Sequence, residues 1–465
     1  MARQYDTKSA RGQMMLNENI TTLIPKMALP TIIAQLITVI YNLVDTYFVS
    51  ALGTNATAAI GVNSSLESVI NMAATLLAVG TGSYISRLLG AKDEKRANQV
   101  LSTSVFTGLG FSIIVMVLGF TFMSPLVTLL GATPECKQYT IDYANYVLLA
   151  APFMIVTFIL NSSLRSEGSA TLSMIGTGFG GILNCILDPI FINTMGLGVA
   201  GASMATAISK AVSCLILVYP YVAKKSLITI SIKSVKFVWD DIKEVISISS
   251  SSFFRSALQV FSGTLMNNIA GNFSTSVLAA VSVGNRVMRF PFAIVMGFSQ
   301  GYQPVVGFNW GAKRYDRVKK AFTFSSWVAG IGAVIMGLML IVGAPLVISV
   351  FNKSADPEVA KIGAMFVRFE SATLPIHALV AIVNMYYAGI GRPVEALAIS
   401  TARQGYCLVP CLLIIPKIFG EIGITACQAT ADGLTIFIGL PLMIRALKQL
   451  NKKIEEQKAN PNPAG

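Results

Sequence analysis

Charged residues are scarce in this chain. Only 12% of its 465 residues are Asp, Glu, Lys or Arg, whereas a soluble domain usually carries about 25%. Hydrophobic residues make up 54% of the chain, which leaves too little polar surface to cover a globule in water. These proportions exclude an ordinary soluble domain and predict a protein that crosses a membrane several times.

Histidine and closely spaced cysteine pairs are almost absent as well. The chain has one histidine, His377, and its six cysteines form no CxxC motif. Cys407 and Cys411 share a helix face, but no histidine cluster joins them. A structural metal site and a redox-active dithiol are therefore not expected, and the cysteines should pack as small hydrophobes.

Long, continuous apolar runs are abundant. A helix needs about 20 apolar residues to cross a bilayer, and continuous rather than alternating hydrophobicity favours helices over a closed barrel. The sequence therefore predicts an all-α polytopic membrane protein with twelve transmembrane helices, at residues 24–50, 57–86, 99–123, 140–163, 170–194, 198–222, 244–268, 274–302, 321–347, 360–389, 394–416 and 421–444.

The net charge of +13 has a particular distribution along the chain. Basic residues lie in short segments between the apolar runs, without interleaved aromatic residues, which is not the pattern of a nucleic-acid-binding surface. Alternate segments, starting from the N-terminus, contain 25 Lys and Arg residues, and the intervening loops contain four. Because cytoplasmic loops carry this excess, both termini are expected in the cytoplasm, with the chain in a bacterial plasma membrane.

The two halves of the chain resemble each other. Gly90-Ala91-Lys92 recurs in the second half as Gly311-Ala312-Lys313. Further matches at almost the same separation join Pro152 to Pro375, Asn161 to Asn384, Gly168 to Gly391 and Gly198 to Gly420. This nearly constant offset predicts two six-helix lobes of the same orientation, related by a pseudo-two-fold axis along the membrane normal.

The repeat divides the chain into an N-lobe (1–222), a cytoplasmic basic linker (223–243), a C-lobe (244–447) and a cytoplasmic tail (448–465). The end of the tail, Asn460–Gly465, is polar and is expected to be disordered. Two bundles around a central cleft can rock and open it to either side in turn. This architecture favours a transporter over a channel, a receptor or an enzyme.

Asp45 is the most informative single residue. It stands in the apolar run Leu29–Val49, within the first predicted span or near its outer end. A carboxylate at membrane depth costs roughly 2.5–3.5 kcal/mol on insertion scales. Chains keep such groups to bind an ion, to relay a proton or to pair with a charged substrate.

Span five carries a second polar set. Asn184 and Asp188 are four residues apart and share one helix face, and Pro189 lets the helix bend and free backbone carbonyls. Thr206, in the sixth predicted helix, adds a hydroxyl. Together with Asp45, these oxygens would suit a hard cation such as Na⁺ or a proton shared by the carboxylates. In the alternative, Asn184 and Asp188 cap bent backbone near the outer face.

These motifs resemble the multidrug and toxic compound extrusion (MATE) family, most closely its bacterial multidrug-exporter branch. The resemblance covers nearly the whole chain, and Asn184-x-x-x-Asp188-Pro189 in a fifth span is its most specific part. The other matching features are Pro30 ahead of Asp45, Arg87-x-x-Gly90-Ala91-Lys92, Gly198-x-x-Gly201-Ala202 and the repeated motif at Gly311.

The resemblance implies secondary active export of lipophilic cations and drugs, by antiport against H⁺ or Na⁺, as the two lobes rock. It implies a conformational hinge at Pro30, and no cofactor other than the coupling ion. Some branches carry an acid in span seven and another in span ten. In this chain the interior of span seven, Ser249–Asn268, contains no acid, and Glu370 in span ten is not taken to match the aspartate of those branches. Coupling is therefore assigned to the N-lobe, at Asp45, Asn184, Asp188 and Thr206.

The cleft is expected to hold varied small molecules, since methionine and aromatic surfaces repack around different ligands. Glu67 and Lys210 form a buried ion pair in one interpretation. In the other, Glu67 binds the cationic drug. An isolated histidine such as His377 is more often structural than a proton relay. The candidate cleft residues are Gln35, Tyr41, Asn42, Asn63, Glu67, Met266, Asn267, Met288, Met296 and His377.

Two rival functions stay open at this point. A flippase for lipid-linked precursors would need a large cationic cleft, and Arg255, Arg286 and Arg289 favour it. A membrane prenyl-transfer enzyme would need two Asp-rich motifs, and the only candidate, Asp240-Asp241-x-x-Glu244, fits the first turn of a helix better. The expected partners are small lipophilic cations, drugs and membrane lipids, with no nucleic acid, and the protein is expected to be a monomer.

Overall fold

The computed structural model describes residues 2–50, 52–351 and 356–459. All regular elements in these ranges are helical, as expected where backbone groups must find partners without water. Asn460–Gly465, which are predicted to be disordered, lie outside the described residues.

The helices follow the two halves of the sequence. The first half contains α1 (Ala2–Asn17), α2 (Ile20–Ser50), α3 (Thr54–Gly90), α4 (Glu94–Thr121), α5 (Met123–Leu129), α6 (Lys137–Ser166), α7 (Ala170–Pro189) with a π-helical turn at Ile190–Thr194, and α8 (Gly198–Val222). The second half contains α9 (Trp239–Phe273), α10 (Thr275–Gly311), α11 (Tyr315–Phe351), α12 (Pro357–Gly389), α13 (Pro393–Thr401), a π-helical turn at Ala402–Tyr406, and α14 (Leu408–Ala459).

The described part of the chain crosses the membrane twelve times, as predicted. Ten of its helical stretches are long and apolar enough by composition, but that number leaves out α9 and counts α13 and α14 as one stretch, Pro393–Ala459. α9 has 35 residues, enough to cross, and its serine-rich sequence lowers its hydropathy. α14 is broken at Gly420, whose φ of 58° is not helical, so this stretch contains the eleventh and twelfth spans.

Several of the observed helices are longer than the predicted spans. α3, α10 and α11 have 37 residues each, whereas a span needs about 20. The apolar pattern marks only the part of a helix that lies in lipid, and the extra turns continue beyond it. α9 accordingly begins at Trp239, inside the predicted linker, with Asp240 and Asp241 in its first turn.

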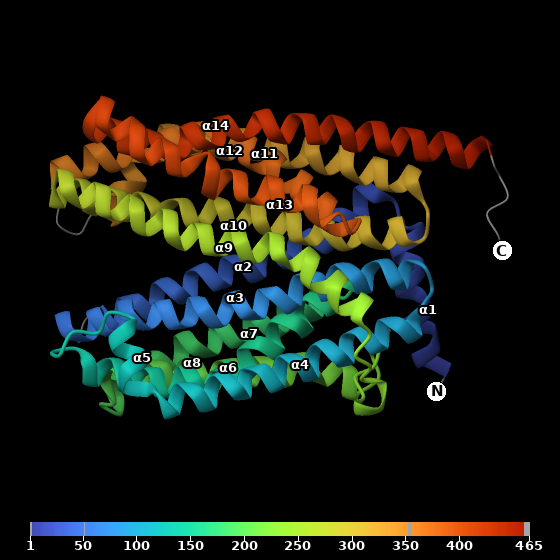
Figure 1. Ribbon diagram of the computed structural model, residues 1–465, viewed down its shortest axis with the longest axis horizontal. Coiled ribbons are helices and arrows are strands. Elements are labelled where there is room, and N and C mark those ends of the chain that lie inside the picture. Colours follow the sequence, from blue (N-terminus) through green and yellow to red (C-terminus); the bar gives the residue numbers. More distant parts are fainter. Residues whose placement is uncertain (1, 51, 352–355, 460–465) are drawn as a thin grey trace.

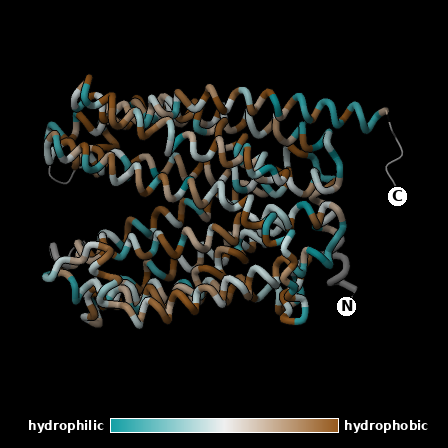
Figure 2. The backbone as a smooth tube through the Cα atoms, in the orientation of Figure 1, coloured by the Kyte–Doolittle hydropathy of each residue, from teal (hydrophilic) through white to brown (hydrophobic). Residues whose placement is uncertain are grey.

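The two halves form two bundles that lie side by side, with both termini at the same end (Figure 1). Figure 2 shows apolar residues along the length of both bundles and hydrophilic residues along the last turns of α14, at the end that carries the termini. α3 and α10 have the same length and end at Gly90 and Gly311, the repeated glycines. The two-lobe prediction is thus confirmed.

The lobes touch directly at the end that carries the termini. Gly90 faces the backbone carbonyl of Phe308, and Gly311 faces the backbone carbonyl of Arg87. A Cβ atom at either glycine would overlap the facing oxygen. The repeated glycines therefore allow α3 and α10 to approach each other reciprocally.

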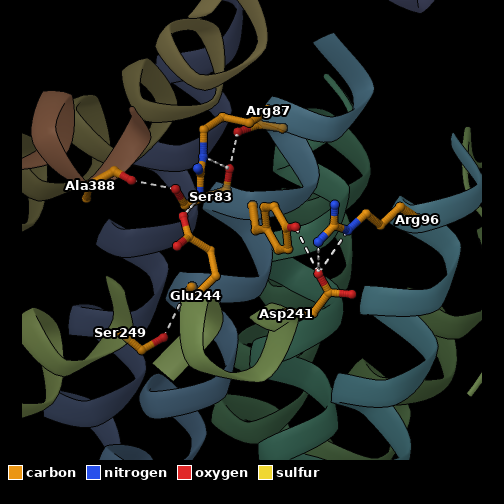
Figure 3. A network of polar contacts seen from close by, with 10 residues as sticks. Ser83, Arg87, Arg96, Asp241, Glu244, Ser249 and Ala388 are labelled. Atoms are coloured by element: carbon orange, nitrogen blue, oxygen red, sulfur yellow. Dashed lines mark hydrogen bonds and ion pairs between the residues drawn. The ribbon is translucent and has the colours of Figure 1, made fainter. Parts of the chain in front are cut away.

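Charged groups reinforce this closed end. Asp241 of α9 accepts hydrogen bonds from Tyr84 at 2.9 Å and from Arg96 at 2.7 Å. Arg87 Nη2 lies 2.8 Å from Glu244 Oε1, although its N–H is not aligned for a hydrogen bond. Figure 3 shows these N-lobe side chains converging on the start of α9. We call Tyr84, Arg87, Arg96, Asp241 and Glu244 the interlobe clamp.

Candidate functional site

A cavity of about 400 Å³ lies in the N-lobe and reaches the boundary with the C-lobe. Helices α2, α3, α6, α7 and α8 supply most of its lining, and the C-lobe contributes Ser252, Arg255, Gln300, Gln303 and Met385. This volume falls in the range of about 300–1,000 Å³ that is usual for small-molecule sites. We call it the N-lobe cavity.

Asp45 lines the N-lobe cavity from α2. Its carboxyl atom Oδ1 is enclosed and has no hydrogen-bond partner among the described residues. Asp188 and Glu67 are close enough to act on it electrostatically. A carboxylate placed among other acids, at membrane depth, needs a proton or a cation to compensate its charge.

Asn184, Asp188 and Thr206 are joined by hydrogen bonds. Asn184 Nδ2 donates to Asp188 Oδ1 and to Thr206 Oγ1, each at 3.2 Å. These bonds leave Asn184 Oδ1 and Asp188 Oδ2 buried and unpaired in the described structure. With Asp45 Oδ1, three unpaired acceptor oxygens therefore belong to the predicted coupling residues.

This arrangement has a clear chemical preference. Hard cations take oxygen ligands from carboxylates, amides and hydroxyls, and unpaired acceptors can equally hold a proton between them. The described residues contain no group of three or more His, Cys, Asp or Glu side chains that could hold a metal ion. The oxygens can therefore hold a hard cation such as Na⁺ or a proton.

Glu67 and Lys210 both line the N-lobe cavity, but the expected direct ion pair is not among the pairs formed by the described residues. Lys210 Nζ instead donates to Tyr41 Oη at 3.0 Å and lies 4.9 Å from the centre of that ring. Tyr143 Oη donates to Glu67 Oε1 at 3.3 Å. Each charge therefore has a tyrosine as its hydrogen-bond partner, and both charged side chains line the cavity.

Four of the predicted cleft residues line the N-lobe cavity: Gln35, Tyr41, Asn42 and Glu67. Gln35 also donates from Nε2 to Gln300 Oε1 at 3.1 Å, and so joins the two lobes. Tyr143 and Arg165 line the same cavity and are absent from the sequence-based set. Arg165 could have been found as a charge at the end of span four, whereas a tyrosine such as Tyr143 carries no such signal.

The other predicted cleft residues lie elsewhere. Asn63 donates to the carbonyls of Ala59 and Thr140, at 2.9 and 3.1 Å, and so holds α3 against α6. Met266 and Met288 are buried in the apolar core of the C-lobe. Asn267 is exposed and is not part of the N-lobe cavity.

Met296 and His377 line a second, smaller cavity of about 60 Å³ in the C-lobe, which we call the C-lobe cavity. The His377 ring packs edge-on against Phe292, with centroids 5.0 Å apart. Arg255 and Arg403 face the same space. Arg403 is a charge in span eleven that sequence reasoning did not consider.

Comparison with known proteins gives a consistent result. The MatE family model matches residues 30–190 and 252–413. Multidrug export protein MepA of Staphylococcus aureus (strain NCTC 8325 / PS 47) is 30% identical over 412 residues, which cover 88% of this chain and 90% of that protein. MepA of Staphylococcus haemolyticus (strain JCSC1435) is 28% identical over 419 residues, which cover 89% of this chain and 91% of that protein.

Solved structures agree in fold. One, described as an outward-facing conformation of a multidrug resistance MATE family transporter, has a TM-score of 0.90 at 23% identity and covers 95% of this chain and 99% of that chain. Another, of a MATE protein in the straight conformation, has a TM-score of 0.89 at 23% identity with the same coverage. The family match spans both lobes, and the chain therefore belongs to the MatE family of membrane transporters.

Proposed function

We propose that this protein exports lipophilic, cationic small molecules from the bacterial cell and drives their export by inward flow of H⁺ or Na⁺. One observation carries the proposal: three buried acceptor oxygens, on Asp45, Asn184 and Asp188, have no hydrogen-bond partner in the described structure. The names of the relatives, multidrug export proteins, support the same function. No cofactor is needed beyond the coupling ion.

Competition for negative charge couples the two flows. Asp45 and Glu67 both line the N-lobe cavity, so a cationic substrate and a coupling ion are drawn to the same region. Entry of H⁺ or Na⁺ at the Asp45 and Asp188 carboxylates neutralises them and weakens their hold on the substrate. Release of the ion restores the negative charge and prepares the cavity for the next substrate.

The lobes alternate access by rocking. The excess of Lys and Arg in alternate loops supports a cytoplasmic location for the end with the termini. The interlobe clamp and the glycine contacts close that end, so the present arrangement corresponds to a cavity sealed from the cytoplasm. Transport then requires the clamp to open and the opposite ends of the lobes to approach.

Pro30 is the proposed hinge of this cycle. In the present structure α2 runs as one helix from Ile20 to Ser50 through Pro30. Proline lacks the backbone N–H that would donate to the preceding turn, so the helix can bend at Pro30, which is the nearer of its two prolines, Pro25 and Pro30, to Asp45. Bending at Pro30 would move Asp45 relative to α7 and so change the coupling site.

The flippase alternative has less support. Of the arginines that favoured it, Arg286 and Arg289 line neither cavity in the described structure. A lipid diphosphate needs several converging basic groups. The N-lobe cavity does contain three basic groups, Arg165, Lys210 and Arg255, but the acids Asp45 and Glu67 line the same cavity and disfavour a diphosphate there.

The test is ethidium efflux from cells that produce the protein. Asp45→Asn keeps the size of the side chain and removes its charge, so efflux should be abolished while folded protein remains in the membrane. Asp142→Asn is a matched control, because Asp142 is bonded to Gln138 at a solvent-exposed position and should leave efflux unchanged. Undiminished efflux by Asp45→Asn would refute the assignment.

A further inference from the structure

Arg255 is a positive charge without a counter-charge. It lies near the middle of α9 and lines both the N-lobe and the C-lobe cavity. No hydrogen bond or ion pair of the described residues includes its guanidinium. The one charged side chain that acts on it appreciably is Arg403, itself a cation. Since charges at membrane depth are normally paired, Arg255 calls for an anion.

Two buried acids of the C-lobe, Asp432 and Glu370, act on Arg403 and not on Arg255, although Glu370 Oε2 has no hydrogen-bond partner in the described structure. Asp432 binds Arg403 through both carboxyl oxygens, at 2.7 and 3.1 Å, and also accepts from Gln428 at 2.9 Å. Glu370 interacts with Arg403 and with Asp432, and neither acid lines the C-lobe cavity. Asp432 therefore neutralises the charge of Arg403, whereas the N–H donors of Arg255 have no partner among the described residues.

The polar side chains that line the C-lobe cavity can donate hydrogen bonds. His377 Nδ1 is buried without a partner in the described structure, and an imidazole can carry its N–H on that nitrogen. Arg403 and the neutral side chains of Gln259, Asn384, Ser400 and Gln404 complete the polar lining. The cavity thus contains two guanidiniums, of which Arg403 is paired with Asp432, an imidazole and amide groups, and no carboxylate of the described residues.

The size of this space limits what can bind there. Its volume is about 60 Å³, well below the roughly 300–1,000 Å³ of a site for a whole drug-sized molecule. It can admit one polar group of a larger ligand. Arg255 also borders the N-lobe cavity of about 400 Å³, which can hold the rest of that ligand next to Asp45 and Glu67.

We propose that the C-lobe cavity binds the carboxylate of substrates that carry both a negative and a positive group, with Arg255 as its main donor. The cationic part of such a substrate lies in the N-lobe cavity near the acids. A planar guanidinium binds a carboxylate through two parallel hydrogen bonds, which would fix the orientation of the substrate across the two lobes. The inference rests on the proposed export function and assigns the part of the protein that binds the carboxylate of a zwitterionic substrate.

The first test compares norfloxacin, which has a carboxylate and a basic amine, with norfloxacin methyl ester, which keeps only the amine. Binding to purified protein is measured by equilibrium dialysis. The acid should bind wild-type protein about 10- to 100-fold more tightly than the ester, the range expected for hydrogen bonds to a charged group. Arg255→Gln should abolish this preference, and Arg255→Lys should keep part of it. Arg286→Gln is the control and should keep all of it, because Arg286 is an exposed arginine of α10 that lines neither the N-lobe nor the C-lobe cavity.

Wild-type protein that binds the acid no more tightly than the ester overturns the proposal, as does an unchanged preference in Arg255→Gln. Efflux separates this inference from the function on which it rests. In cells, Arg255→Gln should lose norfloxacin efflux while ethidium efflux stays close to wild type. Equal loss of both compounds would make Arg255 a structural residue and refute the carboxylate subsite. Absence of ethidium efflux in wild-type cells would refute the export function, whereas the binding comparison would still decide the subsite.

Discussion

The two lobes share a fold and differ in where they keep their charges. At the offset of the repeated glycine motif, Glu67 corresponds to Met288, which is packed in the C-lobe core. At nearly the same offset, Lys210 corresponds to Asp432, which is paired with Arg403. At these positions the N-lobe therefore presents Glu67 and Lys210 to a cavity, whereas the C-lobe has an apolar residue and an acid that is paired with Arg403.

This difference shows which part of a repeat the fold fixes. Equal helix lengths and the glycine contacts are kept in both copies because they are needed for the lobes to pack. Charged positions outside these contacts have diverged between the two copies. Coupling ions are accordingly expected in the N-lobe, and Arg255 is one of the C-lobe cations that form no ion pair among the described residues.

The largest effect on stability should come from the C-lobe ion pair. Arg403 and Asp432 are buried together, and removal of one member leaves an uncompensated charge that costs about 3–5 kcal/mol. Arg403→Gln should therefore lower the thermal unfolding midpoint in detergent markedly, and the double variant Arg403→Met/Asp432→Leu should restore much of it. Lys210→Met should lower the midpoint far less, because Lys210 has no carboxylate partner within an ion-pair distance among the described residues. Equal losses from both single variants would contradict the contrast between the lobes.

A smaller effect on stability is expected from Glu167, which lies in the loop between α6 and α7. Its counterpart in the second half of the repeat is the apolar Ile390. Its carboxylate is buried and accepts from Ser226 Oγ and from the backbone N–H of Leu227, each at 2.6 Å. Burial raises the pKa of Glu167 from 4.5 to about 7, against the opposing effect of these bonds and of Arg11.

The sign of the pH dependence follows from this shift. Between pH 4.5 and about 7 the folded protein holds a proton at Glu167 that the unfolded chain has lost, so stability rises as the pH falls through this window, by up to roughly 3 kcal/mol. Above pH 7 the benefit is gone. Thermal unfolding midpoints of Glu167→Gln should lack this component of the wild-type pH dependence. Parallel curves for the two proteins would contradict the assignment.

The smallest effect is expected from the interlobe clamp. Arg87 and Glu244 are partly exposed, so their interaction is worth about 1 kcal/mol after solvent screening. Glu244→Gln should shift the equilibrium several-fold toward lobes separated at the terminus end, measured as the distance distribution between spin labels on α3 and α9. The charge swap Arg87→Glu/Glu244→Arg should return the distribution toward wild type. A distribution that does not change in Glu244→Gln would show that the Arg87–Glu244 pair does not help to hold this end closed.

The sequence predicts the architecture well and the site in part. Twelve spans and two lobes follow from apolar runs and a constant repeat offset, because lipid imposes both helix and minimum length. Asn184, Asp188 and Thr206 could be grouped because helix periodicity places the first two on one face. The helix faces of Met266 and Met288 could not be predicted, since helices that are apolar on all sides give no amphipathic signal. Arg255 was visible as a charge, but its lack of a partner appears only in three dimensions.

Drug efflux from proteoliposomes with imposed ion gradients tests the central claim most directly, that the N-lobe carboxylates couple export to an ion. A H⁺ gradient and a Na⁺ gradient are applied separately to vesicles with wild-type protein or Asp45→Asn. The account predicts that at least one gradient drives ethidium transport by wild-type protein and that neither gradient drives it in Asp45→Asn. Gradient-driven transport of equal rate in both proteins would contradict it.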